Sequence, residues 1–157
     1  MIDAAAEKAA LTGRHELAEY LRLKATNDAI RTTAVGWLLD TFLQIVSAAM
    51  RERTNLIVER EEPYAFPRGS STMVGTLIDV KNGVRRLGLA AGWARTPAHG
   101  IMQNHALAYA RFTHFGMPEA GAELRLIRGQ DLPRWLNEEG VPTDSGELEH
   151  HLNILLS

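Results

Sequence analysis

The chain has 157 residues, 45% of them apolar and 23% charged, and 17 Lys and Arg against 19 Asp and Glu give a formal net charge of −2. Because positive charge is not in excess, this balance argues against nucleic acid and anionic membranes as partners. The absence of Cys excludes disulfides, thiolate catalysis and Cys-ligated metal sites. The length predicts a single domain, residues 1–157, with a core of its own.

The N-terminal part of the chain predicts a short helix followed by an ambiguous stretch. Residues 3–12 are rich in alanine and precede Gly13, a residue that favours the end of a helix. Residues 16–25 fit a helix by spacing, but part of this stretch alternates as a strand would, so both structures remain open. No apolar run at this end matches a signal peptide or a membrane span, so we expect a soluble cytoplasmic protein.

A long apolar helix is the main feature of the sequence. Asn27 and Asp28 form a good N-cap pair, and no proline follows until well past Arg53. Apolar residues cover most of the circumference of this helix, and its polar residues fall at i, i+4, i+7 and i+11: Asp40, Gln44, Ser47 and Arg51. Because a helix that is apolar nearly all round needs enclosure, we expect a sheet that curls around it, or a second subunit.

A β-hairpin follows the helix. Residues 54–61 predict a strand that runs into a loop with Pro63 and Pro67. Residues 71–81 and 84–93 are rich in β-formers, and the Asn82-Gly83 pair between them favours a type I′ turn.

The turn fixes the expected register of this hairpin. It places Lys81 opposite Val84 and Asp79 opposite Arg86. One face of the hairpin is then apolar, and the other gathers small residues, which indicates strong curvature or the close approach of another surface. These small residues are Gly75, Gly88, Ala90 and Gly92.

The rest of the chain predicts two strands and two helices. Residues 103–115 and 122–128 alternate as strands, residues 131–139 predict a helix that ends at Gly140, and Ser145 begins a final amphipathic helix. The sequence therefore predicts an α+β domain with a helical appendix at residues 129–157.

Three segments within residues 27–115 carry a family resemblance: Leu38-Leu39-Asp40-Thr41, the hairpin 80–86 and the strand 106–112. They resemble the hotdog fold, and in particular its PaaI-type acyl-CoA thioesterases. The resemblance implies an antiparallel sheet wrapped around a long central helix, residues 27–115 as the core, and a homodimer or higher homo-oligomer. It also implies hydrolysis of an acyl thioester at the dimer interface, with coenzyme A as part of the substrate and no other cofactor.

Within this resemblance Asp40 occupies the place of the family's general base or nucleophile. Where the family has His-Gly-Gly at the start of the helix, this chain has Arg31-Thr32-Thr33. Backbone N–H groups near Thr32 and Thr33 would hold the substrate carbonyl there, but glycine allows a closer approach, and oxyanion donors are commonly worth about 10²–10³ in rate. Two alternatives therefore stay open. The first is a non-catalytic acyl-binding, lipid-binding or assembly protein, in which Asp40 only belongs to the solvent-exposed stripe of the helix. The second is an interaction module without an interior tunnel.

Basic residues and histidines offer two further candidate sites. Lys81, Arg85 and Arg86 could bind the phosphates of coenzyme A, or could simply form a solvated hairpin tip. His99, His105 and His114 lie close in sequence, but regular strand geometry puts the last two on opposite faces. We therefore expect no metal site, and we expect His150-His151 to be solvated.

Overall fold

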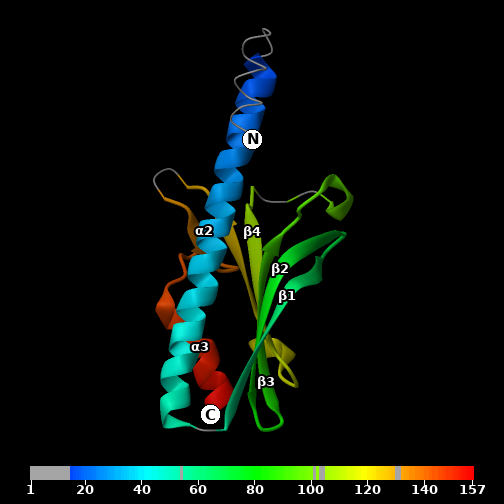
Figure 1. Ribbon diagram of the computed structural model, residues 1–157. Helices are drawn as coiled ribbons and strands as arrows, with labels where there is room; N and C mark the ends of the chain where they lie inside the picture. The colour runs from blue at the N-terminus through cyan, green and yellow to red at the C-terminus, as the bar shows by residue number, and fades with distance from the viewer. Residues whose placement is uncertain (1–14, 54, 101, 103–104, 130–131) are drawn as a thin grey trace.

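The computed structural model describes residues 15–53, 55–100, 102, 105–129 and 132–157. A long helix, six strands and a second helix follow one another along the chain (Figure 1). The helix predicted at residues 3–12 lies outside the described residues. The elements are α2 (His15–Glu52), β1 (Leu56–Arg68), β2 (Ser71–Asn82), β3 (Arg85–Trp93), η1 (Pro97–His99), β4 (Ala108–His114), η2 (Pro118–Ala120), β5 (Ala122–Ile127), β6 (Arg134–Leu136) and α3 (Ser145–Leu156).

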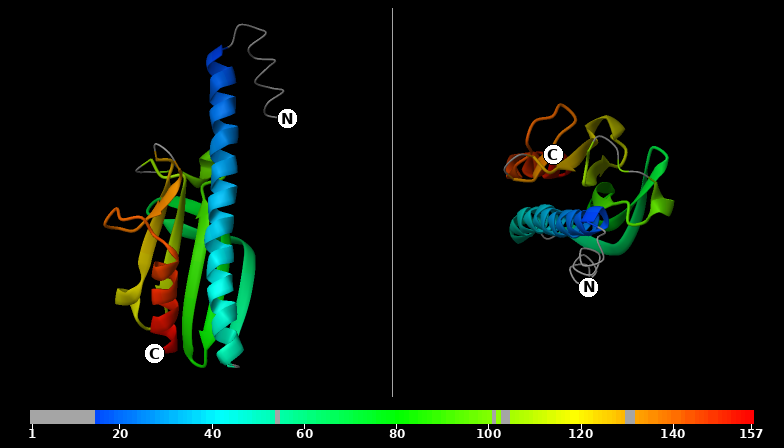
Figure 2. Two further views of the ribbon diagram at one scale, coloured as in Figure 1. Left: turned by 90° about the vertical axis from the view of Figure 1, so that its left-hand side faces the viewer. Right: turned by 90° about the horizontal axis from the view of Figure 1, so that it is seen from above.

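Helix α2 is longer than predicted. It is one helix of 38 residues, so residues 16–25 are helical and the alternative of a strand is wrong. Asp28 does not cap the helix; it lies inside it and forms ion pairs with Lys24 at 3.2 Å and Arg31 at 2.9 Å, one turn away on either side. The first turns of α2 project beyond the sheet (Figures 1 and 2).

The sheet covers only one side of α2. The buried apolar residues of α2 are Val35, Leu38, Leu39, Phe42 and Val46. On the other side Asp40, Gln44 and Ser47 are exposed, and Trp37 is 46% exposed. The sheet and α3 flank the helix without closing around it (Figure 2). The prediction that the sheet of one chain encloses the helix is therefore wrong, and cover by a second subunit stays a prediction. The stretch Arg22–Glu52 is also long and apolar enough to cross a membrane, although here its buried face packs on the sheet.

The six strands form an antiparallel meander in the order β1-β2-β3-β4-β5-β6. Strand β1 continues through Pro63 and Pro67, where the sequence predicted a loop. Both prolines are tolerated because β1 is an edge strand, and the register with β2 shifts between Glu61 and Tyr64.

The hairpin between β2 and β3 turns one residue later than predicted. Asn82 pairs with Arg85, so the central turn residues are Gly83 and Val84. Gly83 has a φ of +64°, and glycine at the first central position is typical of a type II′ turn, in contrast to the predicted type I′ turn. Every pairing consequently shifts by two residues.

A shift of two residues leaves each side chain on its predicted face, because side chains alternate with a period of two. Ile78 pairs with Leu89 and Val80 with Leu87, and all four lie in the core under the helices. The predicted apolar face is thus confirmed although the predicted pairs were wrong.

Two of the small residues on the other face are explained by the sheet itself. Gly75 and Gly92 form a pair, and a Cβ on Gly75 would lie 1.8 Å from the carbonyl oxygen of Ala91. The backbones of β2 and β3 approach each other too closely for any side chain at this pair. Gly75 and Gly92 therefore need no second surface to explain them, whereas a Cβ on Gly88 would meet only side chains, at 3.4 Å or more.

The C-terminal region is part of the core. Residues 134–136 form β6 and pair with β5, so the helix predicted at residues 131–139 is wrong. The side chain of Asn137 accepts hydrogen bonds from the N–H groups of Glu139 and Val141, which favours a turn over a helix. The final helix is confirmed as α3, and it is no appendix, since Leu148, Leu152 and Leu155 share one core with α2 and the sheet.

Candidate ligand-binding site

An apolar groove of about 670 Å³ lies between α2 and the segment around β6. One wall is the side of α2 that carries Ile30, Ala34 and Trp37, and the other is built by Trp135 and its neighbours. The described residues that line the groove are Ala29, Ile30, Thr33, Ala34, Trp37, Pro133, Arg134, Trp135, Pro142 and Thr143.

Trp135 ties the two walls together. Its ring is buried, it pairs with Leu126 of β5, and its indole Nε1 donates a hydrogen bond to the Ala34 carbonyl of α2 at 3.1 Å. The Trp135 carbonyl accepts a hydrogen bond from the Thr143 N–H at 2.8 Å, which holds the next loop in place. These contacts fix the groove before any ligand enters.

The chemistry of the groove suits an apolar chain. Among the described residues that line the groove, Arg134 alone is charged, and it is exposed. The volume falls in the usual range for ligand pockets, about 300–1,000 Å³. An apolar molecule could therefore fill the groove while an acidic end group remains near Arg134.

The predicted oxyanion residues, Thr32 and Thr33, line different cavities. Thr33 lines the groove, but Thr32 does not, and the Thr32 hydroxyl donates to the Asp28 carbonyl at 2.9 Å. Because α2 already begins at His15, the backbone N–H groups at Thr32 and Thr33 lie inside a helix, where N–H groups bond the carbonyl four residues earlier. The prediction that they lie free at a helix N-terminus is wrong.

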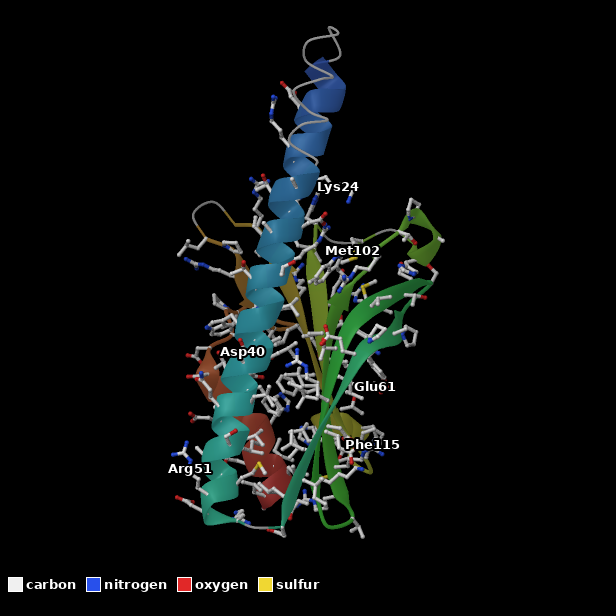
Figure 3. All side chains as sticks on the ribbon, viewed as in Figure 1. Lys24, Asp40, Arg51, Glu61, Met102 and Phe115 are labelled. Carbon is white, nitrogen blue, oxygen red and sulfur yellow. The ribbon has the colours of Figure 1, made fainter. Side chains whose placement is uncertain are left out.

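Asp40 lies on the outer side of α2 and is exposed (Figure 3). It does not belong to the groove lining. The burial that would activate a carboxylate as a general base is therefore not provided by this chain alone.

The basic residues of the hairpin have internal partners. Lys81 pairs with Glu59 at 2.9 Å. Arg85 donates to the carbonyls of Ile154 and Ser157, and so supports the negative C-terminal end of α3. Arg86 binds Asp79 at 2.7 Å, and this hydrogen bond raises the pKa of Arg86. The structure thus gives each residue predicted to bind coenzyme A another role.

Sequence reasoning missed a buried histidine pair. His114 Nε2 lies 2.8 Å from His151 Nδ1, and the His151 ring stacks on Phe112 with ring centroids 4.0 Å apart. Burial lowers the pKa of both histidines, and that of His151 falls to about 4. His151 was expected to be solvated, but only its neighbour His150 is exposed. The signal was available, since His151 follows Leu148 by three residues on the apolar face of α3.

The other histidines are placed separately. His99 Nδ1 accepts hydrogen bonds from the N–H groups of Arg95 and Thr96, and His105 is exposed. Among the described residues, no group of three or more potential ligands is placed to hold a metal ion.

Comparisons of the chain with protein-family models, with curated proteins and with solved structures found no match.

Proposed function

We propose that this protein binds an apolar chain, such as the acyl chain of a fatty acid or thioester, in the groove between α2 and β6. The observation that carries the proposal is the preformed apolar volume of about 670 Å³ between Trp37 and Trp135. Trp37 is a large side chain left 46% exposed at the edge of this volume, and covering it with a ligand would remove apolar surface from water.

Binding without hydrolysis accounts best for the placement of the other candidate residues. Asp40 faces solvent outside the groove, and Lys81, Arg85 and Arg86 are engaged within the fold. An acyl-binding role needs none of these residues, whereas thioester hydrolysis needs a base and an oxyanion site next to the carbonyl.

The proposed architecture is a hotdog-like domain that acts as a homodimer. A long helix packed on a six-stranded antiparallel sheet is compatible with that fold. A second subunit would supply the cover that α2 lacks on the side of Trp37 and Asp40.

Isothermal titration calorimetry with decanoate tests the proposed binding. We expect saturable binding to the wild-type protein and about tenfold weaker binding to Trp37→Ala, since the variant loses part of an aromatic wall. Leu23→Ala is the matched control, because Leu23 is equally an exposed apolar residue of α2 but lies outside the groove. Absence of saturable binding to the wild-type protein would contradict the proposal, as would equal losses in the two variants.

Thioester hydrolysis at a dimer interface is the second candidate function. One observation favours it: Thr33, Trp37 and Asp40 follow one another at i, i+4 and i+7 and so share one face of α2. A second subunit packed on this face would bury Asp40 next to the groove.

Release of free thiol from a panel of acyl-CoA substrates tests this second function. If the protein hydrolyses thioesters, Asp40→Asn is expected to abolish thiol release without lowering the melting temperature, because Asp40 is exposed. A wild-type protein that releases no thiol from any substrate would reject hydrolysis, and unchanged turnover in the variant would remove Asp40 from the mechanism.

A further inference from the structure

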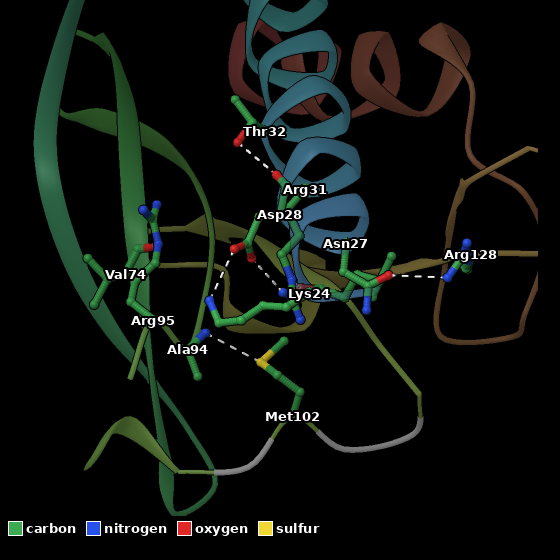
Figure 4. Close-up of polar contacts among 11 residues, drawn as sticks. Lys24, Asn27, Asp28, Arg31, Thr32, Val74, Ala94, Arg95, Met102 and Arg128 are labelled. Carbon is green, nitrogen blue, oxygen red and sulfur yellow. Dashed lines mark hydrogen bonds and ion pairs between the residues drawn. The ribbon is translucent and has the colours of Figure 1, made fainter. Parts of the chain in front are cut away.

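A second concavity, a polar cleft of about 470 Å³, lies between α2 and the loop that follows β3 (Figure 4). It shares no lining residue with the apolar groove. Among the described residues that line it, the charged ones are Lys24, Arg31 and Arg95 against one carboxylate, that of Asp28. The cleft therefore carries an excess of positive charge, unlike the chain as a whole.

Asp28 is shared between two of the cations. It lies 3.2 Å from Lys24 Nζ and 2.9 Å from Arg31 Nη1. Arg31 is held further by a hydrogen bond of 2.7 Å from its Nε to the Leu107 carbonyl, and only 16% of its side chain is exposed. The guanidinium of Arg31 is thus fixed in the wall of the cleft by contacts that reach from α2 to the chain before β4.

Arg95 supplies a charge that is not held in a close ion pair within the described residues. Its guanidinium lies over the Trp93 ring, 3.6 Å from the centroid, and its Nε donates to the Val74 carbonyl at 3.1 Å. Within the described part of the chain, no ion pair to Arg95 is formed. Burial lowers the pKa of Arg95, and the nearby charge of Arg31 lowers it further, against the opposing effects of Asp28 and Glu62. A bound anion would favour the charged form of Arg95 and so oppose both effects.

The loop that carries Arg95 is already ordered by its own side chains. His99 Nδ1 accepts hydrogen bonds from the N–H groups of Arg95 at 3.0 Å and Thr96 at 3.3 Å. The N–H of Ala94 lies 3.4 Å from the sulfur of Met102, which accepts its hydrogen bond. Binding in this cleft would therefore cost little ordering of the loop.

We propose that this cleft binds the phosphate group of a small phosphate monoester. A phosphate carries nearly two negative charges at neutral pH, which matches three cations less one carboxylate. Guanidinium groups offer planar pairs of N–H donors that fit phosphate oxygens. The inference does not depend on the apolar groove, because the two cavities are built from different residues.

Isothermal titration calorimetry at fixed ionic strength, with inorganic phosphate and with glycerol 1-phosphate as probes, tests this site. We expect saturable binding to the wild-type protein and about tenfold weaker binding to Arg95→Gln, which loses one charged donor pair. Lys24→Gln, at an exposed position, is a second variant and is expected to weaken binding several-fold. Arg51→Gln is the matched control: Arg51 is exposed at the other end of α2 and is not among the cleft residues.

Tighter binding of glycerol 1-phosphate than of inorganic phosphate would support an organic ligand, and equal binding would support free phosphate in the same site. The proposal is overturned if the wild-type protein binds neither probe. It is also overturned if Arg95→Gln and Lys24→Gln both bind as the wild-type protein does, or if Arg51→Gln weakens binding as much as Arg95→Gln.

Discussion

Replacing Phe42 with alanine is expected to lower the free energy of unfolding by about 4 kcal/mol, since truncating a buried Phe removes its transfer free energy and leaves a cavity. Phe42 is fully buried in the middle of the face that α2 presents to the sheet. Its ring meets the edge of Phe112 on β4, with centroids 5.9 Å apart. The substitution therefore weakens the contact that joins the long helix to the sheet.

Urea denaturation followed by circular dichroism measures this loss. Met50→Ala is the control on the same helix, because Met50 is exposed and its truncation is expected to cost less than about 1 kcal/mol. A loss below about 1 kcal/mol for Phe42→Ala would mean that α2 does not pack on the sheet through this face.

Acidification is expected to destabilise the fold through His151. Because burial lowers the pKa of His151 to about 4, the folded state leaves this group neutral at pH values where the unfolded state, with an ordinary pKa of about 6.5, binds a proton. Stability is then fully present above about pH 6.5 and falls as the pH drops toward about 4, by roughly 3 kcal/mol in all. Below that window, both states are protonated and this contribution stays constant.

The groups that face His151 also lower its pKa, either directly or through His114, with one exception. His114, stacked and hydrogen-bonded from β4, and the neighbouring His150 lower the pKa of His151. Arg85 of β3 lowers that of His114. Glu147 opposes them from one turn away, with its Oε1 3.6 Å from His151 Nε2.

Melting temperatures measured between pH 4 and pH 8 test this prediction. His151→Gln should flatten the pH dependence, because the group that titrates is removed. His105→Gln is the control at an exposed position outside the pair and should keep the slope of the wild-type protein. An equal slope in all three proteins would show that the histidine pair does not link folding to pH.

The sequence predicted the long helix but not its surroundings. Apolar residues do dominate α2, yet Trp37 and the small residues near it face solvent or the groove. Composition cannot distinguish an apolar residue packed in a core from one that lines an open groove, because the two are equally hydrophobic. The start of the helix was predicted wrongly because Asp28 was interpreted as an N-cap. An Asp can also lie inside a helix when cations such as Lys24 and Arg31 lie one turn away.

The hairpin shows which part of a sheet a sequence determines. The alternation of Ile78, Val80, Leu87 and Leu89 fixed the face of the sheet that is buried. The pairs themselves depended on the turn, and the change from a type I′ to a type II′ turn moved them by two residues.

The groove and the cleft could not be predicted from local patterns. Trp135 was assigned to a helix, although it forms part of a strand of three residues and reaches Ala34, far away in the sequence. Arg95 becomes distinctive only because the fold places it beside Arg31 and over Trp93. Such sites depend on tertiary contacts, which residue spacing does not reveal.

The central claim, that the groove between α2 and β6 holds an apolar chain, is tested most directly by NMR with a fatty acid that carries a nitroxide near its methyl end. The chain has three Trp residues; Trp37 and Trp135 line the groove, whereas Trp93 lines the polar cleft. We predict that the nitroxide broadens the indole N–H signals of Trp37 and Trp135 more strongly than that of Trp93. Equal broadening of all three signals, or broadening of Trp93 alone, would contradict the claim.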